Sequence, residues 1–195
     1  MIFGRYLYLA KFLLIKIFSN FFMKWKLLLF GITGAKHSNF YGQTYIYKAN
    51  NSFIKLGNRL TFRSYPNSNL IGINRNCSLS TLRFNSQIVI GDYCGLSGTV
   101  IGAFTKIELG KGVMCGANTL ITDSDWHIDD PRSGVCKPIT IEDNVWLGEG
   151  VKVLKGVTIG KNSVIGAGSI VTKSIPANVI AAGNPCRIIK QHIVF

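Results

Sequence analysis

Acidic residues are absent from the first 91 positions of this chain, which hold twelve lysines and arginines. Residues 92–195 contain ten basic residues and all nine acidic ones. The formal charge of +13 is therefore divided into +12 in the first part and +1 in the second. This division excludes a uniformly basic shell, and it indicates a cationic front for an anionic surface, followed by a near-neutral part with a different task.

The chain also lacks the cysteine spacing of a disulfide scaffold or a zinc knuckle. Its five cysteines are odd in number and widely spaced, and no two form a Cys-x-x-Cys pair. A reducing, cytoplasmic compartment is the simplest expectation. With 195 residues, 47% apolar and only 16% charged, the chain is long enough for one domain, or for one domain with an appendage, and is not disordered.

Residues 1–36 lack the uninterrupted apolar run of ~20 residues that would cross a bilayer. The pattern predicts a helix over residues 1–30 that is rich in aromatic and aliphatic residues. On a helical wheel its basic residues share one broad arc and the apolar side chains take the other, which is typical of a helix lying on anionic lipid. The basic residues of this helix are Arg5, Lys11, Lys16, Lys24 and Lys26.

This pattern predicts a peripheral position at the inner face of the cytoplasmic membrane. Two alternatives stay open for the segment. A signal peptide would have its charges before the apolar run, whereas here they are scattered through it. A helix packed on the rest of the chain, or on a neighbouring subunit, would also be apolar.

A period of six residues dominates the second half of the chain. Six consecutive hexads, from Ile141 to Pro176, each begin with an aliphatic residue and stay in phase. Similar hexads begin upstream, with one extra residue between Leu96 and Leu109. The first positions of all these hexads are Ile90, Leu96, Leu109, Cys115, Ile121, Ile141, Leu147, Val153, Ile159, Ile165 and Val171.

A six-residue repeat fits a short strand plus a turn, and three such faces close one triangular coil. Because no single hexad buries its apolar face, the coils must stack. The repeat predicts an all-β fold, a parallel β-helix solenoid over residues 37–195, preceded by the basic, apolar helical segment 1–36. Its regular part runs from Leu56 to Pro176, with a weak, aromatic-interrupted start at 38–89.

The hexad pattern [LIV]-G-x-x-[STAV]-x resembles that of the hexapeptide-repeat acyltransferases, which are left-handed parallel β-helices. The closing stretch, residues 144–190, resembles their sugar O-acetyltransferase branch, which includes maltose and galactoside acetyltransferases. The resemblance covers residues 54–190. It implies acetyl-CoA as the donor, a sugar hydroxyl of a surface polysaccharide or its lipid-linked precursor as the acceptor, no metal, and a homotrimer with sites between neighbouring chains.

The repeat breaks most strongly at residues 121–138, ITDSDWHIDDPRSGVCKP. His127 lies in this break and is the only histidine inside the repeat region. An imidazole beside carboxylates can accept a proton near neutral pH. The resemblance implies that His127 is the general base toward the acceptor hydroxyl. Asp125 is a candidate for orienting His127, although an aspartate in a loop is as often a turn former.

The resemblance also implies the remaining site residues. Trp146 is expected to line the active-site cleft, with an edge aromatic as the alternative, and a backbone amide near Gly148 and Glu149 is expected to stabilise the oxyanion. Two positions depart from the family pattern, since Glu149 replaces a small polar residue and Lys190 replaces a common arginine. The residues expected to contact CoA are Glu149, Ala167, Thr172, Lys173, Arg187 and Lys190.

Other chemistries fit less well. Cys115 opens a hexad and should point into the core, which argues against a cysteine nucleophile. A zinc site of three converging histidines cannot be assembled from this coil, and the repeat contains no element that reads nucleic acid. Two alternatives to O-acetyl transfer remain: an N-acetyltransferase acting on a nucleotide-linked amino sugar, and a non-catalytic β-helix scaffold at the membrane.

Overall fold

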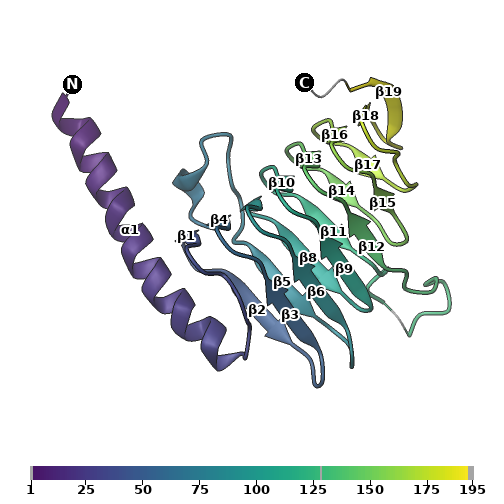
Figure 1. Cartoon of the computed structure of the whole chain (residues 1–195), viewed down its shortest axis with the longest axis horizontal. Coiled ribbons are helices and arrows are strands. Elements are labelled where there is room, and N and C mark those ends of the chain that lie inside the picture. Colours follow the sequence, from purple (N-terminus) through teal and green to yellow (C-terminus); the bar gives the residue numbers. More distant parts are fainter. Residues whose placement is uncertain (1, 128, 193–195) are drawn as a thin grey trace.

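The computed structural model, which describes residues 2–127 and 129–192, has one long helix in front of a coil of strands (Figure 1). The helix, α1, runs from Ile2 to Leu29. Behind it the chain winds through three sheets, so that most strands pair in parallel with the strands three places earlier and later. The predicted parallel β-helix with an N-terminal helix is confirmed.

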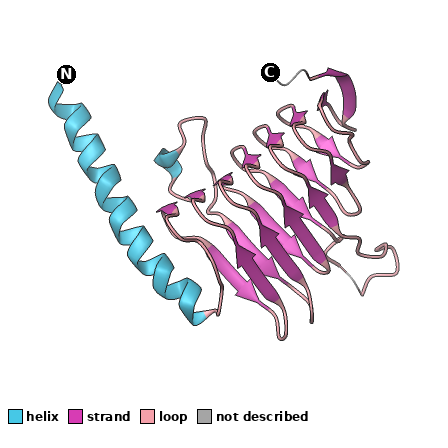
Figure 2. Cartoon of the chain, in the orientation of Figure 1, coloured by secondary structure: helices cyan, strands magenta, loops and turns pink. Residues whose placement is uncertain are grey.

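The strands are short and the turns between them tight (Figure 2). Sheet A contains β3 (Phe53–Leu56), β6 (Gln87–Ile90), β9 (Lys106–Leu109), β12 (Ile139–Ile141) and β15 (Thr158–Ile159). Sheet B contains β1 (Asn39–Tyr41), β4 (Thr61–Arg63), β7 (Gly95–Ser97), β10 (Met114–Cys115), β13 (Trp146–Leu147), β16 (Val164–Ile165), β18 (Val179–Ala182) and β19 (Arg187–Gln191). Sheet C contains β2 (Tyr45–Lys48), β5 (Ser78–Thr81), β8 (Val100–Ala103), β11 (Leu120–Thr122), β14 (Lys152–Val153) and β17 (Ile170–Val171).

The core is a stack of the aliphatic residues that open the hexads. In sheet B the register places Cys115 beside Leu96 on one side and Leu147 on the other. Each coil therefore covers the apolar side chains of the coil before it, as the repeat requires. All predicted first positions are at most 4% exposed: Ile90, Leu96, Leu109, Cys115, Ile121, Ile141, Leu147, Val153, Ile159, Ile165 and Val171.

The first coils keep this register, although their hexads are hard to recognise in the sequence. β1 pairs with β4, and β4 pairs with β7. Inside them Phe40 stacks on Phe62, with ring centroids 4.9 Å apart. The chain leaves the coil between β4 and β5 in a loop, residues 64–77, that contains the short 3-10 helix η1 (Pro66–Ser68). The predicted weak start at 38–89 is thus a regular coil interrupted by a loop.

Both ends of the coil are covered. At the C-terminal end, β19 pairs antiparallel with β18. At the other end, α1 lies across the first coil (Figure 1) and buries Met23 and Leu27, which are 0% and 8% exposed. Covered ends are what a stacked repeat needs, since an open coil would expose its core and its unpaired strand edge.

Asparagines in the left-handed backbone conformation mark the corner between sheets A and B. Asn144, Asn162 and Asn178 have φ values of 56°, 59° and 58°. Their side chains form a ladder, in which the Asn144 Nδ2 donates to the Asn162 Oδ1 at 3.2 Å and the Asn162 Nδ2 donates to the Asn178 Oδ1 at 2.9 Å. Asparagine tolerates a positive φ better than most residues, so it both turns this corner and joins successive coils.

We expect Asn162→Ala to destabilise the coil more than Asn162→Gly does. Both variants lose the two amide hydrogen bonds, but only alanine must hold a left-handed conformation, at a cost of about 1–2 kcal/mol. The measurement is the urea midpoint of unfolding for each variant. Equal midpoints would contradict this account of the corner.

Candidate active site

The loop over residues 123–138 leaves the coil between β11 and β12, at the corner between sheets C and A. Its first residue, Asp123, is fully buried. The Asp123 carboxylate accepts hydrogen bonds from the backbone amides of Phe104 and Thr105, both at 2.7 Å, and from the Thr105 hydroxyl at 2.6 Å. The Asp123 carbonyl accepts from the Lys137 amide at 3.0 Å, so one residue fixes both ends of the loop.

Trp126 holds the next part of the loop against the coil. Its backbone is left-handed, with φ at 70°, and its Nε1 donates to the Thr122 hydroxyl at 2.9 Å. The ring meets Phe104 edge to face, with centroids 5.6 Å apart. A Cβ on Gly102 would lie 2.6 Å from the indole, so this ring position requires a glycine beneath it.

Asp125 is held by Lys155 and Gly134. Its carboxylate accepts hydrogen bonds from the Lys155 ammonium and, at 2.9 Å, from the Gly134 amide. These hydrogen bonds, the Lys155 one first, hold the pKa of Asp125 below its usual value. In the described part of the chain, no hydrogen bond joins Asp125 to the His127 imidazole, so an orienting role for Asp125 stays a prediction.

His127 is exposed and is fixed through its backbone. Its amide donates to the Asp125 carbonyl at 2.9 Å, and its carbonyl accepts from the Asp130 amide at 3.0 Å and from the Ser133 hydroxyl. Within residues 2–127 and 129–192, its imidazole makes no hydrogen bond. The loop thus holds the His127 backbone in place and exposes its imidazole to solvent.

The first group of residues predicted to bind the donor or line the cleft lies on sheet B and at its corner with sheet C. Trp146, on β13 of sheet B, is 58% exposed. Glu149 and Ala167 lie in successive turns at the corner between sheets B and C, where the Gly168 amide donates to the Glu149 carbonyl at 2.7 Å. A Cβ on Gly148 would lie 2.6 Å from the Ala167 nitrogen. This corner is a close stack of backbone with few side chains.

The other predicted donor residues lie at the C-terminal end of the coil. Thr172 and Lys173 follow β17 at the corner between sheets C and A, and both are exposed. Arg187 and Lys190 are exposed on β19, which covers the last coil. The structure therefore provides three exposed cations at this end, and one of them, Arg187, pairs with Ala182, which packs against Gly166 beside the Ala167 corner.

The predicted residues fall into two groups within one chain. Trp146, Glu149 and Ala167 lie along sheet B and its corner with sheet C, whereas His127 lies at the far edge of sheet C. Sheet C therefore lies between His127 and the predicted donor wall within one chain.

The second loop, residues 64–77, lies at the corner of sheets B and C and has no predicted role. Asn118, 8% exposed, accepts from the Asn74 amide at 3.0 Å and donates to the Gly72 carbonyl at 2.9 Å. Asn69 donates to the Ser97 hydroxyl at 3.2 Å. Asn118 and Ser97 anchor this loop. Pro66 and its neighbouring asparagines are the signal that could have revealed it.

Buried cysteines are poor nucleophiles in this structure. Cys115 is 4% exposed, and burial raises the pKa of its thiol well above the usual value. Burial likewise raises the pKa of Cys94 to about 11. The predicted core position of Cys115 is confirmed. Among the residues that the structure describes, no cluster of three histidine, cysteine or acidic side chains could hold a metal ion.

Comparison with known proteins agrees with this architecture. A model of the family described as bacterial transferase hexapeptide (six repeats) matches residues 138–173. A solved maltose O-acetyltransferase from Clostridium difficile is 31% identical, with a TM-score of 0.50, and the match covers 81% of this chain and 71% of that one. The chain therefore belongs to the bacterial hexapeptide-repeat transferase family, and its coil is a left-handed parallel β-helix.

Two further proteins show the range of similarity. Galactoside O-acetyltransferase of Escherichia coli is 44% identical over 114 residues, which cover 55% of this chain and 56% of that protein. An N-acyltransferase from Bacillus cereus, solved with a dTDP-sugar and coenzyme A, has a TM-score of 0.68 over 88% of this chain and 90% of its own. At 20% identity it shares the fold. The chain spans about half the length of the curated relatives it matches.

We expect Lys155→Met to loosen the loop around His127 without unfolding the coil. The variant leaves the Asp125 carboxylate without its ammonium partner, so the Gly134 amide bound to that carboxylate should exchange its proton about two- to fivefold faster. Hydrogen exchange followed by NMR measures this rate. Lys152→Met is the matched control, because Lys152 makes no ion pair in the described chain. Equal exchange rates in the two variants would show that the ion pair does not hold the loop.

Proposed function

We propose that the protein transfers an acetyl group from acetyl-CoA directly to a sugar hydroxyl, with His127 as the general base. The observation that carries this proposal is the loop over residues 123–138. This loop interrupts the coil at one corner. The buried Asp123, the packed Trp126 and the Asp125–Lys155 ion pair hold it so that the His127 imidazole is exposed. Its relatives in Escherichia coli and Clostridium difficile are named galactoside and maltose O-acetyltransferases.

In this reaction the sugar hydroxyl gives its proton to the His127 imidazole as its oxygen attacks the thioester carbonyl. The tetrahedral intermediate collapses with cleavage of the carbon–sulfur bond, and the imidazolium returns the proton to the CoA thiolate. The Gly148 amide already donates to the Ile165 carbonyl at 2.8 Å. The Glu149 amide is therefore the better candidate of the two for the oxyanion donor.

The donor, acetyl-CoA, fits the predicted wall in shape and charge. A pantetheine arm needs a surface without bulky side chains, and the turns at Glu149 and Ala167 stack backbone on backbone. CoA phosphates need cations and hydrogen-bond donors. Lys173, Arg187 and Lys190 supply exposed cations at the end of the coil, and Thr172 supplies a hydroxyl.

We propose a homotrimer in which His127 of one copy faces the donor wall of the next. The outward residues of the coil support this arrangement. On the later strands of sheet A (β9, β12 and β15) they are polar, whereas on the later strands of sheet B apolar side chains follow one another in register, and on sheet C they do so except at Lys152, which lies between Leu120 and Ile170. The outward residues are Lys106, Glu108, Thr140 and Thr158 on sheet A, Met114, Trp146, Val164 and Ile180 on sheet B, and Val100, Leu120, Lys152 and Ile170 on sheet C. Apolar faces in register suit packing against a second copy.

The acceptor that we propose is a sugar of a surface polysaccharide or of its lipid-linked precursor. Two observations support a hydroxyl over an amine. The relatives named O-acetyltransferases are 31% and 44% identical, whereas the N-acyltransferase shares only the fold. The acid-free first 91 residues also suit an acceptor held at an anionic surface.

We expect His127→Ala to lower the rate of acetyl transfer by about two to four orders of magnitude, the usual contribution of a general base. The assay follows release of CoA thiol with galactoside and maltose as acceptors, and with a dTDP-linked amino sugar in parallel. Binding of acetyl-CoA, measured by calorimetry, should stay unchanged because the imidazole does not contact the proposed phosphate cations.

His192→Ala is the matched control, since His192 lies beyond the last coil, and it should keep the wild-type rate. A near wild-type rate in His127→Ala would disprove the general-base role. Faster transfer to the amino sugar than to either hydroxyl acceptor would replace O-acetyl transfer by N-acetyl transfer.

A further inference from the structure

The side of helix α1 that faces the coil has polar residues beside the buried Met23 and Leu27. Two side chains of α1 accept hydrogen bonds from the first coil. The Ser19 hydroxyl accepts from the Gly42 amide at 2.9 Å, and the Asn20 Oδ1 accepts from the Phe40 amide at 2.7 Å. These backbone amides lie in or next to β1, the edge strand of sheet B, and no further strand pairs with them in the described chain. The polar residues of α1 are thus used to complete the coil.

Two lysines of the same arc are used in the same way. The Lys26 ammonium donates to the Thr44 carbonyl at 2.9 Å and lies 5.8 Å from the centre of the Tyr45 ring. The Lys16 ammonium lies 5.9 Å from the centre of the Tyr41 ring. Partial burial lowers the pKa of Lys26 from its usual value. These two cations are therefore bound to the protein itself.

The apolar side of α1 consequently faces away from the coil. A surface helix normally does the reverse, with its apolar stripe on the core. Among the side chains of α1 that the structure describes, nine large apolar ones are more than half exposed, which makes an apolar face that a monomer rarely leaves uncovered. We call these residues the outer face of α1: Leu13, Leu14, Ile17, Phe18, Phe21, Phe22, Trp25, Leu28 and Leu29.

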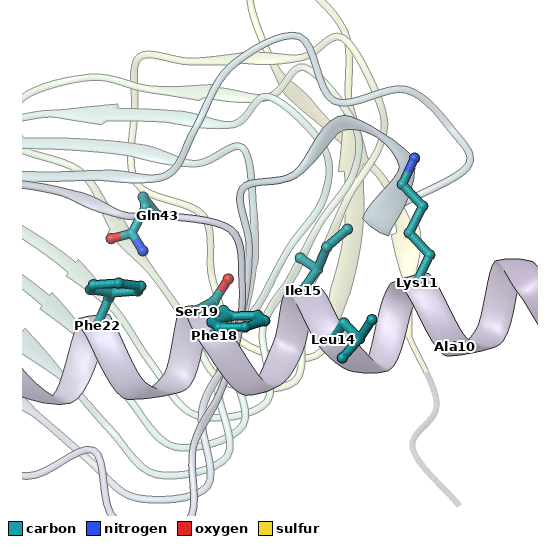
Figure 3. Close-up of a pocket in the computed structure, with 8 residues that line it drawn as sticks. All are labelled: Ala10, Lys11, Leu14, Ile15, Phe18, Ser19, Phe22 and Gln43. Atoms are coloured by element: carbon teal, nitrogen blue, oxygen red, sulfur yellow. The ribbon is translucent and has the colours of Figure 1, made fainter.

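Open grooves flank the helix on both sides. One has a volume of about 600 Å³ and is almost entirely apolar along its floor, with Lys11 and Ile15 projecting from the same side of the helix (Figure 3). The other, of about 870 Å³, runs between α1 and the first coil and includes Lys24. Lys11 and Lys24 are exposed and border the outer face, whereas Lys16 and Lys26 are used by the coil.

Charge decides between the two partners that could cover such a face. A second copy of this chain would bring another acid-free front, with twelve cations, against the first. The like charges of two such fronts, brought together by a second copy bound at the outer face, oppose association. An anionic lipid surface attracts both the cations and the apolar side chains. No helix in the described residues has the length and apolarity of a membrane span. A helix that lies in the plane of the interface meets both conditions.

We propose that the outer face of α1 lies in the surface of an anionic membrane, with its apolar side chains among the acyl chains and with Lys11 and Lys24 at the head groups. Trp25 is then at the depth where tryptophan is enriched in membrane proteins. This inference does not depend on the proposed acetyl transfer, because the outer face contains none of the residues assigned to that reaction.

The test is sedimentation of the full chain with lipid vesicles at low salt. We expect binding to vesicles of phosphatidylcholine mixed with phosphatidylglycerol, and weaker binding to phosphatidylcholine alone or at high salt. The triple variant Phe18→Ser, Phe21→Ser, Trp25→Ser should lose at least about tenfold in partition coefficient, because it removes buried apolar area at the interface. Its melting temperature should match the wild type, since all three side chains are more than half exposed.

The matched control changes three exposed apolar residues elsewhere: Leu70→Ser, Ile71→Ser and Val135→Ser, at 88%, 66% and 79% exposure. It should bind vesicles like the wild type. Brominated lipid should quench Trp25 fluorescence in the unaltered chain, and Trp25→Phe should remove that quenching. The proposal is overturned if the wild type stays in the supernatant, if the control loses as much binding as the triple variant, or if the triple variant changes only the oligomeric state.

Discussion

The inward aliphatic residue of each hexad packs against the inward residue of the preceding coil. These residues form a continuous column through the core, for example Leu96, Cys115 and Leu147, and the rest of the chain depends on this column. A strand of two residues is too short to be stable alone, so the strands at 146–147 or 152–153 exist only because neighbouring coils cover them. The same requirement explains the two covered ends. One end is finished by β19, and the other by the polar side of α1.

The column fixes the register of the strands, so residues beyond those of a regular coil form loops outside it. Both large loops are tied back to the coil by a buried polar residue, Asp123 for residues 123–138 and Asn118 for residues 64–77. The coil therefore holds each loop in place through one buried side chain. This division into coil and loops suits a fold that supports different substrates on one frame.

The repeat predicted the fold well because its signal, one aliphatic residue in six, is also the packing rule. The site was predicted less completely. His127 was found because it lies where the rhythm breaks, but the partner of Asp125 is Lys155, which occupies an ordinary outward place in a hexad. Such a contact joins residues thirty apart around the coil and leaves no local pattern. The sequence predicts an amphipathic helix but not which side packs; its polar arc faces the coil beside Met23 and Leu27, because hydrogen-bond donors at the coil end need acceptors.

The central claim is that one site is built from two copies of the chain. It is tested most directly by mixing two inactive variants, His127→Ala and Ala167→Trp, which remove the base and block the donor wall respectively. If the sites lie between chains, co-refolded mixtures should recover up to about a quarter of the wild-type rate, the share of sites in which two intact halves meet. If each site belongs to one chain, no mixture will be active, and the account of a shared site is wrong.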